Sequence, residues 1–420
     1  MAKPRVLIIS RTDYLHDKES EANTIRSYMT VFPKEDVCSI LCGDFNLNKT
    51  GRLDNHTYQL GHKDILGASL LMKDTRQGGT SIVQAVTSRR KGLGVRGWLK
   101  SLAINIYSLL PYKISQDIKS FINDFRPNII YTTFTNNREL LLAQRISREW
   151  NIPMTPHFFD DWPNVYYKGT SGEIVFRYLF NRRLKLVLKD VPICFCISER
   201  MCAEYERRYT IDKTIQLLNS IESNGCYNCR KAPKSFLYFG SLYLGRGETL
   251  KRLCEVLSQK KSDICIYVGA PERHWKAYEP ILGRYSFVKY LGFLTSDDLV
   301  KVIAKADVLL FVESFENTML DFTRLSLSTR IPELLATGKN ILAMGHHDQG
   351  SITYLRKYNA AYIIDNDQMI DTIIDDVIGA KNSEIIMKNA SCLFHNNHER
   401  QRQQQLFYET IQGVVGQNVY

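Results

Sequence analysis

Short apolar runs alternate along the chain with longer stretches in which apolar positions recur at the spacing of a helix. The first run, Val6–Ile9, has the length of a strand that is buried on both faces. Strand-like runs separated by amphipathic helices are typical of βα units, in which helices cover parallel strands. The pattern therefore predicts an α/β protein with doubly wound parallel sheets.

In the first half of the chain, five apolar runs alternate with helical stretches. The predicted strands are Val6–Ile9, Asn128–Thr132, Ile152–Phe159, Pro192–Ile197 and Thr214–Leu218. An amphipathic helix is predicted over Asn137–Trp150, and Ser198 is predicted to cap the helix that follows it. Residues 219–234 then change to a polar stretch marked by Asn, Gly and Pro, which is typical of an interdomain linker.

A second cycle of strands and helices begins after this polar stretch. The predicted strands are Ser235–Phe239, Asp263–Val268, Val288–Gly292, Val308–Val312, Asn340–Met344 and Ala361–Ile364. The predicted helices are Glu248–Gln259, Ser296–Ala306 and Ile331–Thr337, and Ser296 opens the second of them. A further helix is predicted to begin at Gly350, and a helical tail is predicted over Glu384–Val415. The repetition predicts a second module of the same kind as the first.

The chain has 420 residues, of which 44% are hydrophobic, so it can form two domains with full cores. We predict two Rossmann-like domains that face a cleft. The first domain covers residues 1–218, and the second domain covers residues 235–399. The linker between them covers residues 219–234, and a helix over about 400–420 packs back on the first domain. Ligands of such sheets bind at the carboxyl ends of the strands.

Positive charge is concentrated in the first half of the chain. Residues 1–195 contain 28 Lys and Arg against 18 Asp and Glu, whereas the remaining residues contain 27 against 26. This asymmetry indicates an anionic partner, for which nucleic acid, anionic lipid headgroups and a phosphorylated substrate are the candidates. No nucleic-acid-binding module accompanies the charge, so we expect no nucleic acid partner.

The segment 88–112 mixes cations with Trp, Tyr and aliphatic residues, as an interfacial membrane segment does. The residues predicted to form a membrane or acceptor surface are Arg89, Arg90, Lys91, Arg96, Trp98 and Lys100. A second basic cluster lies on a predicted helix that contains Arg177 and Lys189. The alternative is a core helix with a solvated basic edge.

The ten cysteines are scattered, and several lie in strand-like runs where a reduced thiol acts as a small apolar side chain. This usage predicts a cytoplasmic protein, and the basic segment adds the inner face of the cell membrane as a peripheral location. We expect no metal: Cys226 and Cys229 lack a second pair, and Asp365 and Asp367 are interpreted as part of a turn.

A Gly-rich turn follows the predicted strand Ser235–Phe239 and leads into a helix. It contains Gly240, Ser241, Arg246 and Gly247. Such a turn exposes backbone N–H groups to a phosphate, and an Arg can add a bidentate contact to a diphosphate. The alternative is an ordinary surface turn with a solvated Arg.

A second motif combines Arg330 and Glu333, which share one face of a predicted helix because they are three residues apart. Arg can hold a phosphate, and Glu can accept hydrogen bonds from both hydroxyls of a ribose. The alternative is a surface ion pair.

The order of these motifs over residues 235–365 resembles the C-terminal domain of GT-B glycosyltransferases, and most closely the family-four (glycosyl transferase group 1) enzymes. The resemblance implies that Glu333 binds the donor ribose, that Arg246 and Arg330 contact the diphosphate, and that Gly350 and Ser351 bring backbone amides to the donor.

In the N-terminal half, the resemblance implies a cleft-facing histidine at His157, with a structural histidine as the alternative. Asp160 and Asp161 are candidate general bases for an acceptor hydroxyl, and Asp161 is alternatively a turn residue.

The sequence departs from the family at Leu325, where an acidic residue is expected, and at Ser241, where many members have Arg. Glu313 and Glu316 are the nearby acids that could replace the missing one.

The implied function is a retaining, metal-independent hexosyltransferase of cell-surface polysaccharide biosynthesis. It would use a nucleotide-sugar as co-substrate, no other cofactor, and a glycan or lipid-linked acceptor. One alternative is a sugar-nucleotide epimerase of the same architecture. The other is a non-catalytic nucleotide-sugar binder, which the departure at Leu325 motivates.

Overall fold

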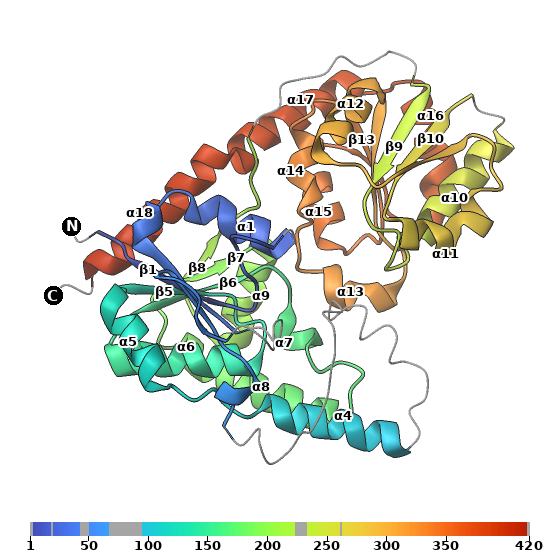
Figure 1. Ribbon diagram of the computed structural model, residues 1–420. Helices are drawn as coiled ribbons and strands as arrows, with labels where there is room; N and C mark the ends of the chain where they lie inside the picture. Colours follow the sequence, from blue (N-terminus) through green and yellow to red (C-terminus); the bar gives the residue numbers. More distant parts are fainter. Residues whose placement is uncertain are drawn as a thin grey trace. The chain divides into compact units, whose positions relative to one another are not determined.

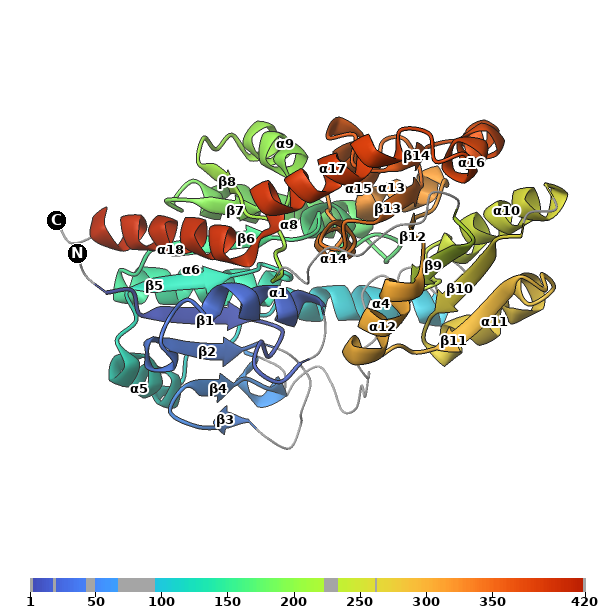
Figure 2. The ribbon, with the colours of Figure 1, turned by 90° about the horizontal axis from the view of Figure 1, so that it is seen from above.

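The computed structural model describes residues 3–17, 20–42, 50–66, 95–222, 233–260 and 263–417. The chain folds into two compact units (Figures 1 and 2). Unit 1 consists of Met1–Leu218 and Gln403–Tyr420, and unit 2 of Asn219–Arg402. Each unit is built on one sheet of mainly parallel strands, so the predicted α/β class with two such domains is confirmed.

The sheet of unit 1 has the strand order β3-β4-β2-β1-β5-β6-β7-β8. Its strands are β1 (Val6–Ser10), β2 (Val37–Leu41), β3 (Gly51–Arg52), β4 (Thr57–Gln59), β5 (Ile129–Thr132), β6 (Met154–Phe158), β7 (Cys194–Cys196) and β8 (Thr214–Gln216). All pairings are parallel except that of β3 with β4. The chain extends the sheet from β1 first toward β2 and later toward β5, so the direction of winding reverses between β1 and β5.

Helices cover both faces of this sheet. The helices of unit 1 are α1 (Ser20–Met29), α4 (Val95–Ser108), α5 (Gln116–Phe125), α6 (Asn137–Trp150), α7 (Trp162–Val165), α8 (Glu173–Leu188), α9 (Glu199–Tyr209) and α18 (Arg400–Gln417), with 3-10 turns at Lys34–Asp36 and His62–Asp64. Ser198 caps α9 by accepting a hydrogen bond from the Met201 N–H, as predicted.

The C-terminal helix α18 completes the core of unit 1. Phe407 is fully buried and packs against the rings of Tyr28, Tyr131 and Phe195 from α1, β5 and β7. Ile411 and further apolar residues of α18 join the same core. One face of the first sheet is therefore covered by a segment almost 200 residues distant from β8.

The sheet of unit 2 is parallel throughout and has the order β11-β10-β9-β12-β13-β14. Its strands are β9 (Ser235–Phe239), β10 (Cys265–Gly269), β11 (Val288–Gly292), β12 (Val308–Val312), β13 (Asn340–Met344) and β14 (Tyr362–Ile364). Its helices are α10 (Arg246–Gln259), α11 (Glu272–Leu282), α12 (Ser296–Lys305), α13 (Asn317–Thr323), α14 (Arg330–Leu335), α15 (Gly350–Lys357), α16 (Ile370–Ile378) and α17 (Ser383–Leu393), with a 3-10 turn at Asp367–Met369.

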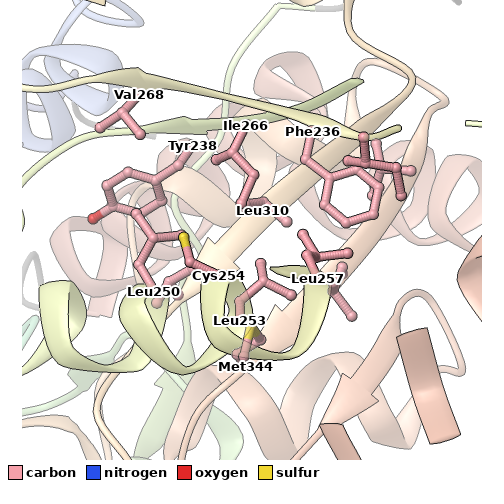
Figure 3. Close-up of a cluster of buried hydrophobic side chains, with 14 of the residues drawn as sticks. Phe236, Tyr238, Leu250, Leu253, Cys254, Leu257, Ile266, Val268, Leu310 and Met344 are labelled. Carbon is pink, nitrogen blue, oxygen red and sulfur yellow. The ribbon is translucent and has the colours of Figure 1, made fainter. Parts of the chain in front are cut away.

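The core of unit 2 forms between the sheet and α10. Leu250, Leu253 and Leu257 recur at helical spacing and lie against the strands, where Phe236 and Leu310 meet them (Figure 3). This packing fixes α10 against β9 and β12, and with it the loop that joins β9 to α10.

Most of the predicted strands of unit 2 match the structure within one or two residues, and the predicted helix that Ser296 opens is confirmed, since α12 begins at Ser296. Thr295 caps this helix, because its side chain accepts a hydrogen bond from the Asp298 N–H. One helix prediction is wrong in detail. The predicted helical tail is interrupted by a π-helical turn at Phe394–His398, which separates α17 from α18. Among the described residues, no helix combines the length and apolar character needed to cross a membrane.

Candidate functional site

The sheet of unit 2 reverses its direction of winding between β9 and β12. The chain places β10 and β11 on one side of β9, and β12, β13 and β14 on the other. Loops that leave neighbouring strands in opposite directions open a crevice at the carboxyl ends of those strands, which is where open α/β sheets bind ligands. The segments 240–245 and 313–316 follow β9 and β12 at this point.

Gly240 follows β9 directly and lies against the guanidinium of Arg330. Its φ of 130° lies in a region that residues with a Cβ rarely adopt, and a Cβ at this position would collide with that guanidinium. Arg330 Nη1 donates a hydrogen bond to the Phe239 carbonyl at 2.7 Å. The two predicted motifs, 90 residues apart in sequence, therefore meet at the end of one strand.

Arg246, the first residue of α10, forms a bidentate ion pair with Glu313. Arg246 Nε and Nη2 lie 3.0 and 2.7 Å from the two carboxylate oxygens. Burial lowers the pKa of Arg246, but the Glu313 carboxylate and the nearby Tyr238 together raise it, and the net shift is upward. The side chains are 13% and 4% exposed. The predicted diphosphate contact and the predicted replacement acid are thus paired with each other.

Glu333 lies one turn after Arg330 on α14 and is half-buried. Burial raises the pKa of its carboxyl group, while the Arg330 charge opposes this shift. Among the residues that the structure describes, no side chain donates a hydrogen bond to this carboxylate. A carboxylate in this state can accept hydrogen bonds from ligand hydroxyls.

The N-terminus of α15 is held beside these residues. The backbone N–H of Ser328 donates a hydrogen bond to Ser351 Oγ at 3.0 Å. A Cβ on Gly350 would collide with the carbonyl of Ser326, so only glycine permits this close approach. The first N–H groups of a helix lack intrahelical partners and can bind an anion. The Oε1 atom of Gln349, just before α15, is buried without a hydrogen-bond partner among the described residues.

The remaining predicted residues of unit 2 lie at the edge of this arrangement. Ser241 Oγ accepts a hydrogen bond from the Tyr243 N–H and shapes the turn after β9. Gly247 is buried in the first turn of α10. Glu316 is exposed at the start of α13, 3.6 Å from Arg252. Leu325, which stands where the family has an acid, is 4% exposed and packed as an apolar residue.

The expectation that His157 faces a cleft is wrong, because its side chain is fully buried in the core of unit 1. Its Nδ1 atom is 2.9 Å from the Tyr131 hydroxyl, and its ring packs on Phe159 at a centroid distance of 4.2 Å. Burial lowers the pKa of His157 to about 3, so the ring is neutral at physiological pH. The structural alternative therefore describes this residue.

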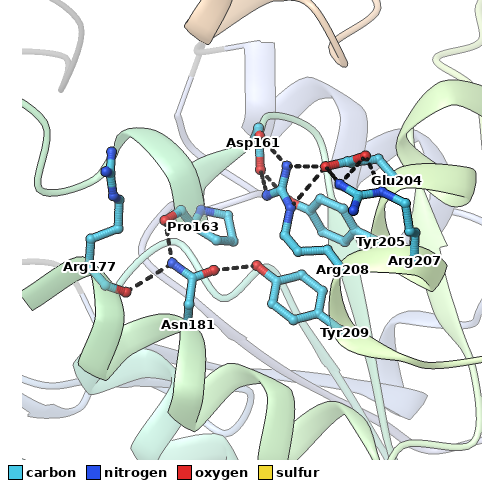
Figure 4. Close-up of polar contacts among 9 residues, drawn as sticks. All are labelled: Asp161, Pro163, Arg177, Asn181, Glu204, Tyr205, Arg207, Arg208 and Tyr209. Atoms are coloured by element: carbon cyan, nitrogen blue, oxygen red, sulfur yellow. Dashed lines mark hydrogen bonds and ion pairs between the residues drawn. The ribbon is translucent and has the colours of Figure 1, made fainter. Parts of the chain in front are cut away.

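The interpretation of Asp161 as a general base also requires correction. Its carboxylate is 4% exposed and forms a bidentate ion pair with Arg208 at 2.6 and 3.0 Å (Figure 4). The Tyr205 hydroxyl donates a third hydrogen bond. Asp161 thus joins the start of α7 to α9. Asp160, next to it, is half-buried and remains the candidate base of this loop.

A pair of acidic residues that the sequence interpretation missed lies at the winding reversal of the first sheet. Glu139 is fully buried and accepts hydrogen bonds from Thr132, the last residue of β5, and from Thr133 and Thr135, which follow this strand. Burial and the charge of Glu139 raise the pKa of Glu21 to about 7. The cluster of Thr residues before Glu139 was the available signal, since a strand end rich in hydroxyls can hold a buried carboxylate.

The predicted surface residues Arg96, Trp98 and Lys100 lie exposed on α4. Arg89, Arg90 and Lys91 lie outside the described residues, as do Cys226 and Cys229. Within the described ranges, no group of three or more His, Cys, Asp or Glu side chains is placed to hold a metal ion.

Neither a protein-family model nor a curated protein matches this sequence. Solved structures, however, match nearly the whole chain. Sucrose-phosphate synthase from Thermosynechococcus elongatus has a TM-score of 0.64 at 10% identity, covering 99% of this chain and 100% of its own. Anabaena HepE in complex with UDP has a TM-score of 0.60 at 13% identity, covering 97% and 100%.

The lipopolysaccharide outer core galactosyltransferase WaaB has a TM-score of 0.56 at 13% identity, covering 98% of this chain and 99% of its own. These neighbours are GT-B glycosyltransferases. At such identities the likeness concerns the fold, and the fold agrees with the order of motifs in the sequence. The chain has the GT-B fold of glycosyltransferases.

Proposed function

We propose that the protein transfers a sugar from a nucleotide-sugar donor to a glycan or lipid-linked acceptor. The observation that carries this proposal is the arrangement of Arg330 over Gly240, with Glu333 one helical turn away and its carboxylate not hydrogen-bonded to any side chain among the described residues. It lies at the winding reversal of a parallel sheet, where nucleotides bind. Support comes from the fold neighbours, one of which, HepE, was solved with UDP.

In this proposal, Glu333 accepts hydrogen bonds from the donor ribose, and Arg330 contacts the diphosphate. The N-terminal amides of α15 at Gly350 and Ser351 add a positive helix end. Fixed positive charge of this kind stabilises the leaving diphosphate without a metal ion. Retention of the anomeric configuration is part of the proposal.

The Arg246–Glu313 pair limits what Arg246 can do. Its guanidinium already satisfies a buried carboxylate, so a diphosphate must share it with Glu313 or displace Glu313. If Glu313 is displaced, its carboxylate becomes available to the sugar or the acceptor. The proposal therefore assigns to Glu313 the work that an acid at position 325 performs in the family.

Donor binding is tested by calorimetry and thermal shift with UDP-, GDP- and ADP-linked sugars. At least one should raise the melting temperature, and Glu333→Ala should weaken its binding by about 1–3 kcal/mol, the cost of unpaired ligand hydroxyls. Glu384→Ala removes an exposed glutamate of the same unit and serves as the control. No stabilisation by any donor, or equal affinity in Glu333→Ala, would contradict the donor site.

Product analysis separates transfer from the alternatives. Turnover that requires an acceptor supports the transferase, and conversion of the donor alone indicates an epimerase. A specific observation favours the second alternative, a non-catalytic binder: the position that is acidic in the family is the buried Leu325, and the buried acid Glu313 is already paired with Arg246. Binding without turnover on any glycan or lipid-linked acceptor would support that alternative.

A further inference from the structure

Helix α4 presents an apolar stripe to solvent. Positions 95, 98, 99, 102 and 106 recur at the spacing that places side chains on one face of a helix. Four of these side chains are exposed: Val95 to 78%, Trp98 to 48%, Leu99 to 54% and Ile106 to 46%. The buried residues of α4 are Ser101, Asn105 and Tyr107. Asn105 lies beside the stripe, because it is seven residues from Trp98, so this helix buries polar side chains next to the apolar ones that it exposes.

Helix α8 has the same unusual exposure. Ile174, Val175, Tyr178 and Leu179 are exposed in its first two turns, the first of them to 77%. Of the 17 exposed large apolar side chains in the described part of the chain, nine lie on these two helices, four on α4 and five on α8. Apolar residues scattered singly over a surface need no explanation, but a concentration on two helices does.

The two apolar regions meet. The Ser171 N–H donates to Ser101 Oγ, and Asn105 donates to the Ser171 carbonyl at 2.8 Å, which binds the middle of α4 to the start of α8 (Figure 1). A Cβ atom added to Gly172, just before α8, would lie within van der Waals distance of the Leu102 side chain of the stripe. The exposed side chains of both helices therefore belong to one surface, which we call the α4–α8 surface.

Cations border the apolar part of this surface. On α4 they are Arg96 and Lys100, and the helix contains no acidic residue. In the second half of α8, Arg182 and Lys189 are exposed near Leu186. An apolar centre bordered by cations matches the boundary between the acyl chains and the anionic headgroups of a membrane. A protein partner fits less well, because Lys is depleted in protein interfaces, and a second copy would bring like charges together.

We infer that the α4–α8 surface docks on an anionic phospholipid bilayer, with its apolar side chains entering the acyl boundary and its cations contacting phosphates. This inference goes beyond the proposed function, because it concerns a surface of unit 1 and needs neither donor nor acceptor. The failure of one can therefore be distinguished from the failure of the other.

The test uses the full chain and sedimentation with vesicles of phosphatidylglycerol and phosphatidylcholine in equal amounts, at low and high salt. The protein should sediment with these vesicles, and less so at high salt or with phosphatidylcholine alone. The variant Leu99→Ser/Ile174→Ser should reduce the partition coefficient about tenfold or more. The variant Arg96→Gln/Lys100→Gln should remove much of the salt dependence.

Phe293→Ser is the matched control, because Phe293 is 73% exposed but lies in unit 2. It should bind vesicles like the parent chain, and all variants should keep the parent melting temperature because the replaced side chains are exposed. A blue shift of fluorescence on vesicle binding that is lost in Trp98→Phe would place α4 in the lipid. Absence of sedimentation, unchanged binding of the α4–α8 variants, or a dimer that these variants abolish would overturn the inference.

Discussion

At the scale of single residues, the structure places ionisable groups where their charge is costly. Glu21 lies in the first turn of α1, and burial together with the nearby Glu139 charge raises its pKa to about 7. One carboxylate oxygen of Glu21 is buried without a hydrogen-bond partner among the described residues. Such a carboxyl group stays protonated over part of the pH range in which an exposed glutamate is already charged.

The raised pKa of Glu21 predicts a stability that falls with rising pH. A group whose folded pKa exceeds its unfolded value stabilises the fold below the unfolded pKa, and this stability is lost as the pH rises through the folded pKa. For Glu21 the loss spans about pH 4.5 to 8 and amounts to at most about 3 kcal/mol. Glu21→Gln should remove this loss, so its gain in free energy of unfolding over the parent should be larger at pH 8 than at pH 5.

Urea denaturation at the two pH values measures this difference. Glu35→Gln is the control, because Glu35 is exposed in the same unit. An equal effect of Glu21→Gln at pH 5 and pH 8 would mean that Glu21 titrates as an exposed glutamate does.

At the scale of elements, the functional loops are fixed by pairs of residues from distant strands and helices. The Asp161–Arg208 pair connects the start of α7 to α9, and the Arg246–Glu313 pair connects α10 to the end of β12. In both pairs the carboxylate is 4% exposed, so each acid depends on its arginine. Removing one partner of a buried ion pair is more costly than replacing both.

Arg208→Met should lower the free energy of unfolding by about 3 kcal/mol, because it leaves the Asp161 carboxylate buried and unpaired. Chemical denaturation at neutral pH measures the change. The neighbouring Arg207→Met is a matched control, since Arg207 also pairs with a carboxylate, that of Glu204, but its side chain is 73% exposed. It should cost less than about 1 kcal/mol. Similar losses in the two variants would refute the buried-pair account.

The strands and the ion pairs differ in how far the sequence could predict them. Runs such as Ser235–Phe239 and Val308–Val312 were predicted at their observed bounds because a strand buried on both faces is apolar throughout. The motifs around Gly240 and Arg330 were recognised from local chemistry. The pairing of Arg246 with Glu313, 67 residues away, was not, because the sequence alone does not show which strands are neighbours.

The burial of His157 could not be predicted for a related reason. A histidine near the end of a strand has the same local sequence whether its ring faces a crevice or the core. Here Tyr28 of α1 and Phe195 of β7 enclose the ring, and Phe407 of α18 packs on both of them. The environment of His157 is therefore set by segments more than 120 residues before it and 250 residues after it.

At the scale of the whole molecule, the chain passes through unit 1 twice. It leaves after Leu218, forms unit 2, and returns at Gln403 to complete unit 1. The two ends of this excursion are hydrogen-bonded to each other, because Gln403 Oε1 accepts a hydrogen bond from the Leu218 N–H at 3.0 Å. The stability of unit 1 therefore depends on a helix from the far end of the sequence.

Phe407→Ala should destabilise unit 1 by about 3–5 kcal/mol, since it removes a fully buried ring that packs on four other aromatic residues. Denaturation followed by several probes should show an earlier transition for unit 1 and an unchanged one for unit 2. Gln405→Ala, an exposed position of the same helix, serves as the control. A single transition shifted as a whole would show instead that the two units unfold together.

The double passage through unit 1 also has a consequence for how the protein is made. Ribosomes extend a chain by about 5–20 residues per second, so the segment between Leu218 and Gln403 takes roughly 10–40 s. During this time the sheet face that carries Val6, Ile8 and Tyr131 lacks the helix that later covers it. Unit 2 can finish folding before unit 1, and the nascent first half must be kept from aggregating until its last helix emerges.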